Sequence, residues 1–146
     1  MNKKENKAIY KYIHCDPYKR GVSIFIGDCE SLKKWAKKFY NRPDERDLLE
    51  QLDVYCNDRR YINKDVAAST YGSEISGHQL VHIPSFDFKY DPSQLSNVAH
   101  EILHAVFSIL DYVGVEYRYN GTNEPYTYLF EYVFKEALIE KDYKKA

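Results

Sequence analysis

The segment from residue 91 to residue 114 carries the clearest helix signals in the chain, and it limits the fold more than any other stretch. Asp91 is a good N-cap, Pro92 suits the first helical position, and Gln94 can complete a capping box. Gly114 is typical of the position just beyond a helix C-terminus. Apolar residues recur between these ends with a helical period and form a broad stripe. The pattern therefore predicts a central, mostly buried helix.

Inside this helix lies His100-Glu101-Ile102-Leu103-His104, an HExxH pattern. Two residues four positions apart lie on one helical face, so both imidazoles can reach a single metal ion. Glu101 is rotated by about 100° from His100, which lets its carboxylate approach a water on the metal without binding the metal. The pattern predicts a zinc ion held by His100 and His104, with Glu101 as general base in peptide-bond hydrolysis. The competing interpretation is two half-buried histidines and a surface glutamate on a core helix.

A catalytic zinc ion needs a third protein ligand and one open position for water. Glu124 lies at the predicted start of a last helix over about 124–140, and a reversing loop can bring it back beside the two histidines. Glu131, two turns further along nearly the same face, is the competing candidate. His78, His82 and Glu116 could also serve as the third ligand, or the protein could supply none.

The rest of the chain mixes strand signals with helix signals, which predicts a single α+β domain over residues 1–146. Lysines gather at 1–7 and 141–146, which we expect to be flexible ends. The predicted elements are a hairpin over 8–15 and 21–26, helices over about 28–40 and 43–57, and strands over 65–71 and 78–84.

Composition excludes several classes of function. The formal net charge of −1 offers no broad attraction for nucleic acid or an anionic membrane, and no apolar run approaches membrane-spanning length. The N-terminus is basic but lacks the apolar core of a secretory signal. Three cysteines without a CxxC pattern argue against a disulfide framework and for a reducing cytoplasm, with each of Cys15, Cys29 and Cys56 a small buried hydrophobe.

The HEILH motif, a loop and the sequence NEPYTYLFEYVF together resemble a gluzincin. Gluzincins carry HExxH on one helix and a glutamate ligand on the next, at the separation seen in thermolysin-like enzymes. The small size is similar to that of minimal gluzincins and ImmA/IrrE-type peptidases, and closest to short HExxH proteins of phages and prophages. The resemblance covers about residues 78–135.

The resemblance implies a zincin-like fold, in which a small mixed or antiparallel sheet packs on the HExxH helix and a C-terminal ligand-bearing helix. It implies zinc at His100, His104 and Glu124, with Glu101 catalytic, in an enzyme that cuts within a protein or peptide substrate. It also implies that the strand over 79–84 borders the cleft and pairs with an extended substrate.

The donor that would stabilise the transition state is less well defined, because no histidine follows His104. Tyr119 and His82 are the leading candidates, and a role in packing competes with catalysis for each. The further candidates are Tyr117, Tyr128 and His78. A second class of function is a non-catalytic zinc-fold protein that binds and modulates a host protein. A DNA-associated zincin is a weaker third class, since no basic patch is visible.

Overall fold

The computed structural model describes residues 7–58, 67–89, 91–121 and 123–146. Within these ranges the chain forms one mixed five-stranded sheet and four α-helices, which confirms the prediction of a single small α+β domain. The strands are β1 (Ile9–Cys15), β2 (Arg20–Ile26), β3 (Ser69–Gly72), β4 (Gln79–Ile83) and β5 (Lys144–Lys145). The helices are α1 (Cys29–Phe39), α2 (Arg46–Cys56), α4 (Pro92–Tyr112) and α5 (Glu124–Ala137), with 3-10 helices η1 (Pro43–Glu45) and η2 (Glu140–Asp142).

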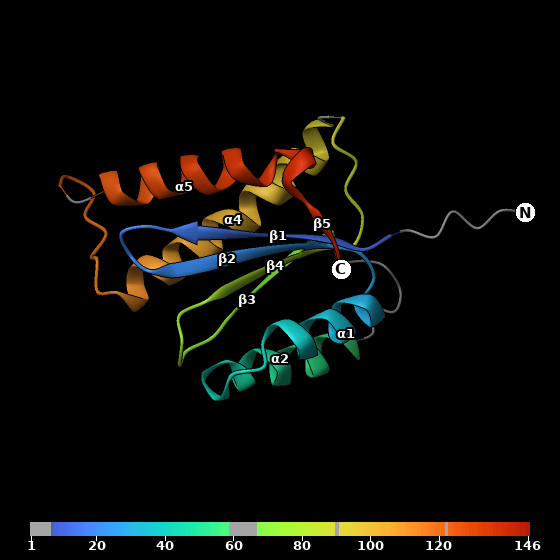
Figure 1. Cartoon of the computed structure of the whole chain (residues 1–146). Helices are drawn as coiled ribbons and strands as arrows, with labels where there is room; N and C mark the ends of the chain where they lie inside the picture. The colour runs from blue at the N-terminus through green and yellow to red at the C-terminus, as the bar shows by residue number, and fades with distance from the viewer. Residues whose placement is uncertain (1–6, 59–66, 90, 122) are drawn as a thin grey trace, which may run out of the picture.

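The sheet has the strand order β3-β4-β2-β1-β5. β1 and β2 form the predicted antiparallel hairpin, and β2 pairs with β4 in parallel. β3 and β5 are the two edge strands, and each is antiparallel to its neighbour. Helices α4 and α5 cover one face of the sheet, and α1 and α2 cover the other (Figure 1).

Alternating side chains along the strands divide the core into two layers. On β2, Val22 and Ile24 pack toward α4 and α5, while Phe25 packs toward α1 and α2. On β4, Val81 and Leu80 make the same division. The sheet is therefore buried on both faces, and the positions open to a partner are at its edges.

The ends of α4 lie where the sequence predicts them. The Asp91 carboxylate accepts hydrogen bonds from the backbone N–H groups of Ser93 and Gln94, and Gly114 adopts a φ of 80°. The predicted capping box does not form, because the Gln94 side-chain oxygen accepts from the Asp87 backbone N–H at 3.1 Å instead. The capped start still holds the helix in register above the sheet.

The prediction that the strand over 79–84 pairs with an extended substrate is wrong. β4 is hydrogen-bonded to β2 on one side and to β3 on the other, so its backbone has no free side for a substrate. Among the described residues, β3 is the edge strand next to β4, and it begins at Ser69; residues 65 and 66 of the predicted strand lie outside that range. Strand order is set by long-range pairing, which local patterns do not encode.

Residues 144–146, expected at a flexible end, pair with β1. The Ala146 backbone N–H donates to the Ala8 carbonyl at 2.9 Å, and β5 lies beside Ile9 and Tyr10. Residues 1–6, expected to be flexible as well, lie outside the described residues.

The cysteine prediction is correct for Cys15, which is fully buried, and wrong for the other two. Cys29 and Cys56 form a disulfide bond. They are 27 positions apart in the sequence, and the packing of α1 against α2 brings their Cα atoms to 5.7 Å. The spacing of the cysteines in the sequence therefore did not indicate that Cys29 and Cys56 form a disulfide bond.

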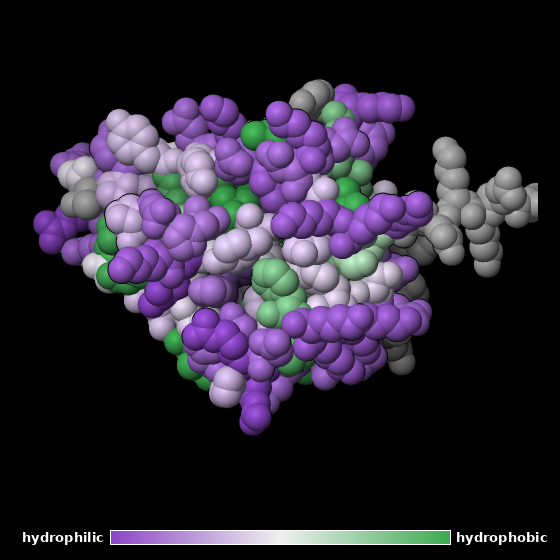
Figure 2. Space-filling view, in the orientation of Figure 1, coloured by the Kyte–Doolittle hydropathy of each residue, from purple (hydrophilic) through white to green (hydrophobic). Residues whose placement is uncertain are grey.

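Polar and charged side chains cover most of the face drawn in Figure 2, and hydrophobic surface is confined there to small, separate areas. Among the described residues, no helix combines the length and the apolar character that a membrane crossing requires.

Candidate metal and catalytic site

Helix α4 presents the two histidines of its HExxH motif on the side away from the core. Its apolar stripe, including Ile102, is buried against the sheet, and this turns His100 and His104 outward. The His100 side chain is 68% exposed, and the two Nε2 atoms lie 3.1 Å apart. The i,i+4 spacing therefore brings the two imidazoles together as the sequence predicts.

The two Nε2 atoms are at hydrogen-bond distance, 3.1 Å apart. In a tetrahedral site with Zn–N bonds of about 2.0–2.1 Å, two imidazole nitrogens lie roughly 3.3 Å apart. Imidazole is a ligand type that zinc prefers. The separation is therefore similar for a hydrogen-bonded pair and for a pair that shares a zinc ion.

Glu101 lies beside the pair, and an edge-strand residue holds its carboxylate. The Thr70 hydroxyl lies 2.6 Å from Glu101 Oε2 and 2.9 Å from the Glu101 backbone oxygen, and the shorter contact is with the carboxylate. The other carboxylate oxygen, Oε1, lies 4.0 Å from His100 Nε2. The Glu101 side chain is only 14% exposed. One oxygen is thus anchored while the other is turned toward the histidines.

Sequence reasoning missed Thr70. The sequence predicts a strand over its segment, but nothing local indicates that this strand lies beside the HExxH helix. The contact spans 31 positions in the sequence. The only signal that could have found it is the need of a buried carboxylate for a hydrogen-bond donor.

The site opens into a cavity of about 410 Å³ along β3. Thr70, Glu101 and His104 line one part of it, and Tyr55 of α2 lines another. The remaining lining residues are Ala68, Ser69, Tyr71, Gly72, Gln79 and Ser108. The cavity is therefore a groove along the edge strand, with α4 and α2 contributing its walls; we call it the β3 groove.

The backbone of β3 faces this groove at alternate positions. The Gly72 carbonyl accepts from the Gln51 side chain at 2.8 Å, on the side away from β4, while the Ser73 N–H donates to the His78 carbonyl. In an antiparallel pair, residues two apart point the same way, so the N–H and C=O of Thr70 also point away from β4. An extended chain laid along the groove could pair with them.

The structure does not bring the predicted third ligand to the histidines. Among the residues that it describes, no group of three or more His, Cys, Asp or Glu side chains is placed to hold a metal ion. Glu124 is exposed at the start of α5, and Glu131 is exposed further along it. Glu116, a further candidate for the third ligand, pairs with Arg118 at 3.0 Å in the connecting loop.

Helix α5 packs on α4 and runs back along it (Figure 1). The centroids of the Tyr126 and Phe107 rings lie 4.7 Å apart in this packing. Glu124 is the first residue of α5, and Glu131 follows about two turns later.

His82, a candidate transition-state donor, lies on the opposite face of the sheet from Glu101. Its ring is buried beside Phe25, and its Nε2 atom lies 2.7 Å from the Gly27 carbonyl. Burial lowers the pKa of His82 and so disfavours the charged imidazole. The sheet separates it from the HExxH residues.

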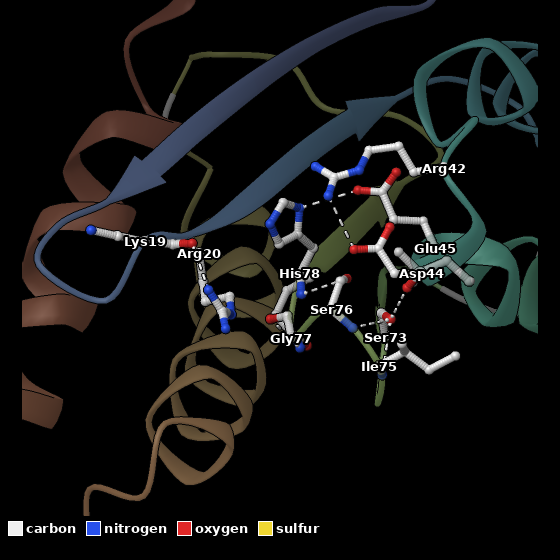
Figure 3. Close-up of polar contacts among 12 residues, drawn as sticks. Lys19, Arg20, Arg42, Asp44, Glu45, Ser73, Ile75, Ser76, Gly77 and His78 are labelled. Atoms are coloured by element: carbon white, nitrogen blue, oxygen red, sulfur yellow. Dashed lines mark hydrogen bonds and ion pairs between the residues drawn. The ribbon is translucent and has the colours of Figure 1, made fainter.

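The remaining candidate donors are three exposed tyrosines and a histidine beside an acidic residue. Tyr119 is 85% exposed in the loop between α4 and α5, and Tyr117 and Tyr128 are exposed too. His78 Nδ1 lies 3.4 Å from the buried Glu45 carboxylate, in a polar cluster between the sheet and the start of α2 (Figure 3). Burial is the main cause that lowers the pKa of His78. Thus the described site brings together His100, His104, Glu101 and Thr70.

Comparisons of the chain with protein-family models, with curated proteins and with solved structures found no match.

Proposed function

We propose that this protein is a zinc-dependent peptidase that hydrolyses peptide bonds at the mouth of the β3 groove. The observation that carries the proposal is the arrangement of Glu101. Its carboxylate is anchored by Thr70 on one oxygen and faces the closely spaced His100 and His104 with the other. The Thr70 contact satisfies one oxygen of a largely buried carboxylate and leaves the other oxygen, 4.0 Å from His100, for proton transfer.

In this proposal His100 and His104 hold the zinc ion through their Nε2 atoms. A bound zinc ion polarises a carbonyl group and makes a water molecule nucleophilic near neutral pH. Glu101 Oε1 accepts a proton from the attacking water and then passes it to the leaving amine nitrogen. Thr70 keeps the Glu101 carboxylate in the rotamer that allows both transfers.

The substrate in this proposal is an extended segment of a protein or peptide. The outward backbone groups of Thr70 offer one N–H and one C=O to such a segment, which supports strand addition at β3. A chain paired with a strand edge runs past Glu101 in both directions. Cleavage within a chain is therefore favoured over removal of terminal residues.

The zincin-like architecture and the third ligand are also part of this proposal. The resemblance to gluzincins favours Glu124, and Glu131 is the competing ligand. Each carboxylate is exposed, so neither is committed to the core.

Zinc content tests the ligand set. The purified chain is expected to hold about one zinc ion, and His104→Ala is expected to lower zinc affinity by at least roughly 100-fold, because even changes behind a ligand cost about 10–100-fold. Competition with a chromophoric chelator measures the affinity. His14→Ala is the matched control, since His14 is exposed and pairs with Asp16 instead.

The same titration of Glu124→Ala and Glu131→Ala identifies the third ligand. If the zinc affinity of one of these variants falls as far as that of His104→Ala, the replaced glutamate is the third zinc ligand. If the wild-type chain takes up no zinc, the HExxH residues serve packing and do not form a metal site.

Thr70→Val is expected to reduce kcat by roughly 10–100-fold with little change in KM. The substitution keeps the shape of the side chain but removes a hydrogen bond to a charged group, a bond that is worth about 1.5–3 kcal/mol. Thr70→Ser keeps the hydroxyl and should retain activity within a few-fold. Steady-state cleavage of a labelled protein substrate gives both constants. Equal loss in the Ser and Val variants would assign Thr70 to strand packing alone.

A second candidate function is a zinc-fold protein that binds a host protein without catalysis. This candidate predicts zinc binding without turnover of any peptide, and it predicts that Glu101→Gln leaves the biological activity intact.

A further inference from the structure

The edge of the sheet opposite β3 is only partly covered. β5 has two residues, whereas β1, the strand beside it, has seven. β5 pairs with Ile9 and Tyr10 and reaches no further along β1 (Figure 1). From Lys11 to Cys15, the strand pairs with β2 on one side and with no described strand on the other. Most of β1 is therefore an edge within the part of the chain that the structure describes.

The backbone of β1 points polar groups out of this edge at alternate residues. The Ala8 carbonyl accepts from the Ala146 N–H at 2.9 Å, so the polar groups of Ala8 point toward β5. In an antiparallel pair, residues two apart point the same way. The N–H and C=O groups of Tyr12 and His14 therefore point to the same side as those of Ala8, beyond the end of β5. A further strand could pair with them.

A cavity of about 480 Å³ lies along this open part of the edge. The residues that line it are Tyr10, Lys11, Tyr12, Phe39, Asp142 and Lys144. The Tyr10 and Tyr12 rings lie on the α1 side of the sheet, with centroids 5.8 and 6.0 Å from that of Phe39. Lys11 points to the other side, where its Nζ lies 2.7 Å from the Glu136 carbonyl of α5. Because side chains of both faces line the cavity, it lies at the sheet edge; we call it the β1 groove.

The charge around the β1 groove is mainly positive. Its two nearest carboxylates, on Glu136 and Asp142, already lie 2.9 and 3.6 Å from the Lys11 ammonium group. Four exposed lysines of β5 and of the last turn of α1 form no ion pair with a described residue: Lys37, Lys38, Lys144 and Lys145. In Figure 2 a pale, less hydrophilic area lies between hydrophilic side chains in the region of β1, β5 and α1. The groove therefore complements a ligand that carries negative charge.

We propose that the β1 groove binds an extended, acidic segment of a partner protein by strand addition to β1. The outward N–H and C=O groups of Tyr12 and His14 pair with the backbone of the segment. The aromatic rings beside Phe39 contact its alternate side chains, and the exposed lysines attract its carboxylates. The proposal does not depend on zinc or on hydrolysis, since the β3 groove lies at the other edge of the sheet.

Fluorescence anisotropy of the full chain with a fluorescein-labelled peptide of alternating Glu and Val residues tests the charge preference. The affinity should fall as salt is raised, and a peptide of alternating Lys and Val should bind at least tenfold more weakly. The double variant Lys38→Glu, Lys144→Glu is expected to bind the acidic peptide at least tenfold more weakly than the wild type. Arg118→Glu is the matched control, because Arg118 is exposed in the loop between α4 and α5.

Hydrogen exchange of single amides, followed by NMR, tests the position of the bound peptide. At a peptide concentration about ten times Kd, the Tyr12 and His14 amides are expected to exchange roughly tenfold more slowly. The Lys11 and Ile13 amides, which face β2, should keep their rates. The Thr70 amide in the β3 groove should also keep its rate.

Three outcomes would overturn the proposal. The first is the absence of binding to the acidic peptide. The second is protection of the Thr70 amide instead of the Tyr12 amide, which would place the peptide in the β3 groove. The third is tighter binding of a fluorescein-labelled oligothymidine, which would make the lysines a nucleic-acid surface. A chain that protects Tyr12 on binding the peptide but cleaves no protein would retain this proposal and remove the peptidase function.

Discussion

Replacement of Glu101 by Gln is expected to lower the turnover of a protein substrate by a factor on the order of 10²–10⁴, which is the usual contribution of a general base. The amide of Gln has the size and shape of the carboxylate but cannot accept the proton of the attacking water. His100 and His104 are unchanged in this variant, so the zinc content should stay near one ion per chain. Cleavage of labelled casein and elemental analysis measure the two properties on one sample.

Glu140→Gln is the matched control for this experiment, because it makes the same chemical change at an exposed position in η2, away from the groove. It should leave turnover unchanged. Full activity in the Glu101→Gln protein would remove the proposed mechanism, whatever its zinc content. A parallel loss in both variants would point to an effect of net charge.

Ile102→Ala is expected to lower the free energy of unfolding by about 2–5 kcal/mol, the range for truncating a fully buried isoleucine. Ile102 lies between the two histidines in sequence and is fully buried in the core between α4 and the sheet. Its neighbour Leu103 is 45% exposed. Leu103→Ala should therefore cost less than roughly 1 kcal/mol, in line with surface substitutions.

Urea unfolding followed by circular dichroism measures both free energies. The pair of variants is informative because both sites lie inside the HExxH motif and differ only in the face of α4 on which they lie. Equal losses would contradict the orientation of α4, and with it the outward position of His100 and His104. A large loss at Leu103 alone would require the helix to be rotated by about 100°.

Several features followed from short stretches of sequence because the interactions that form them are local. The start of α4 depends on Asp91, whose carboxylate caps N–H groups two and three positions later. The approach of His100 to His104 depends on one turn of helix. The hairpin of β1 and β2 depends on two β-rich segments and the turn between them. None of these needed knowledge of the rest of the chain.

The tertiary structure changed those expectations that depended on how neighbouring loops and strands pack. The sequence predicts a capping box at Gln94, but this side chain bonds to Asp87 in the preceding loop. The strand expected to pair with a substrate, β4, is internal, and β3 took the edge. His82 is a candidate catalytic donor by sequence, yet strand alternation places it on the far face of the sheet, next to Phe25.

By itself, the sequence determined the HExxH helix, its ends, the placement of both histidines on one helical face and the α+β class, since hydrophobic period and capping act within a few residues. Only the tertiary structure decided that Thr70 anchors Glu101, that β3 is an edge strand, and that Cys29 meets Cys56. Those contacts join residues between 27 and 31 positions apart, or depend on strand order. Such contacts form only when helices and strands pack together. They could not be predicted from the sequence because many different packings are compatible with the same local pattern.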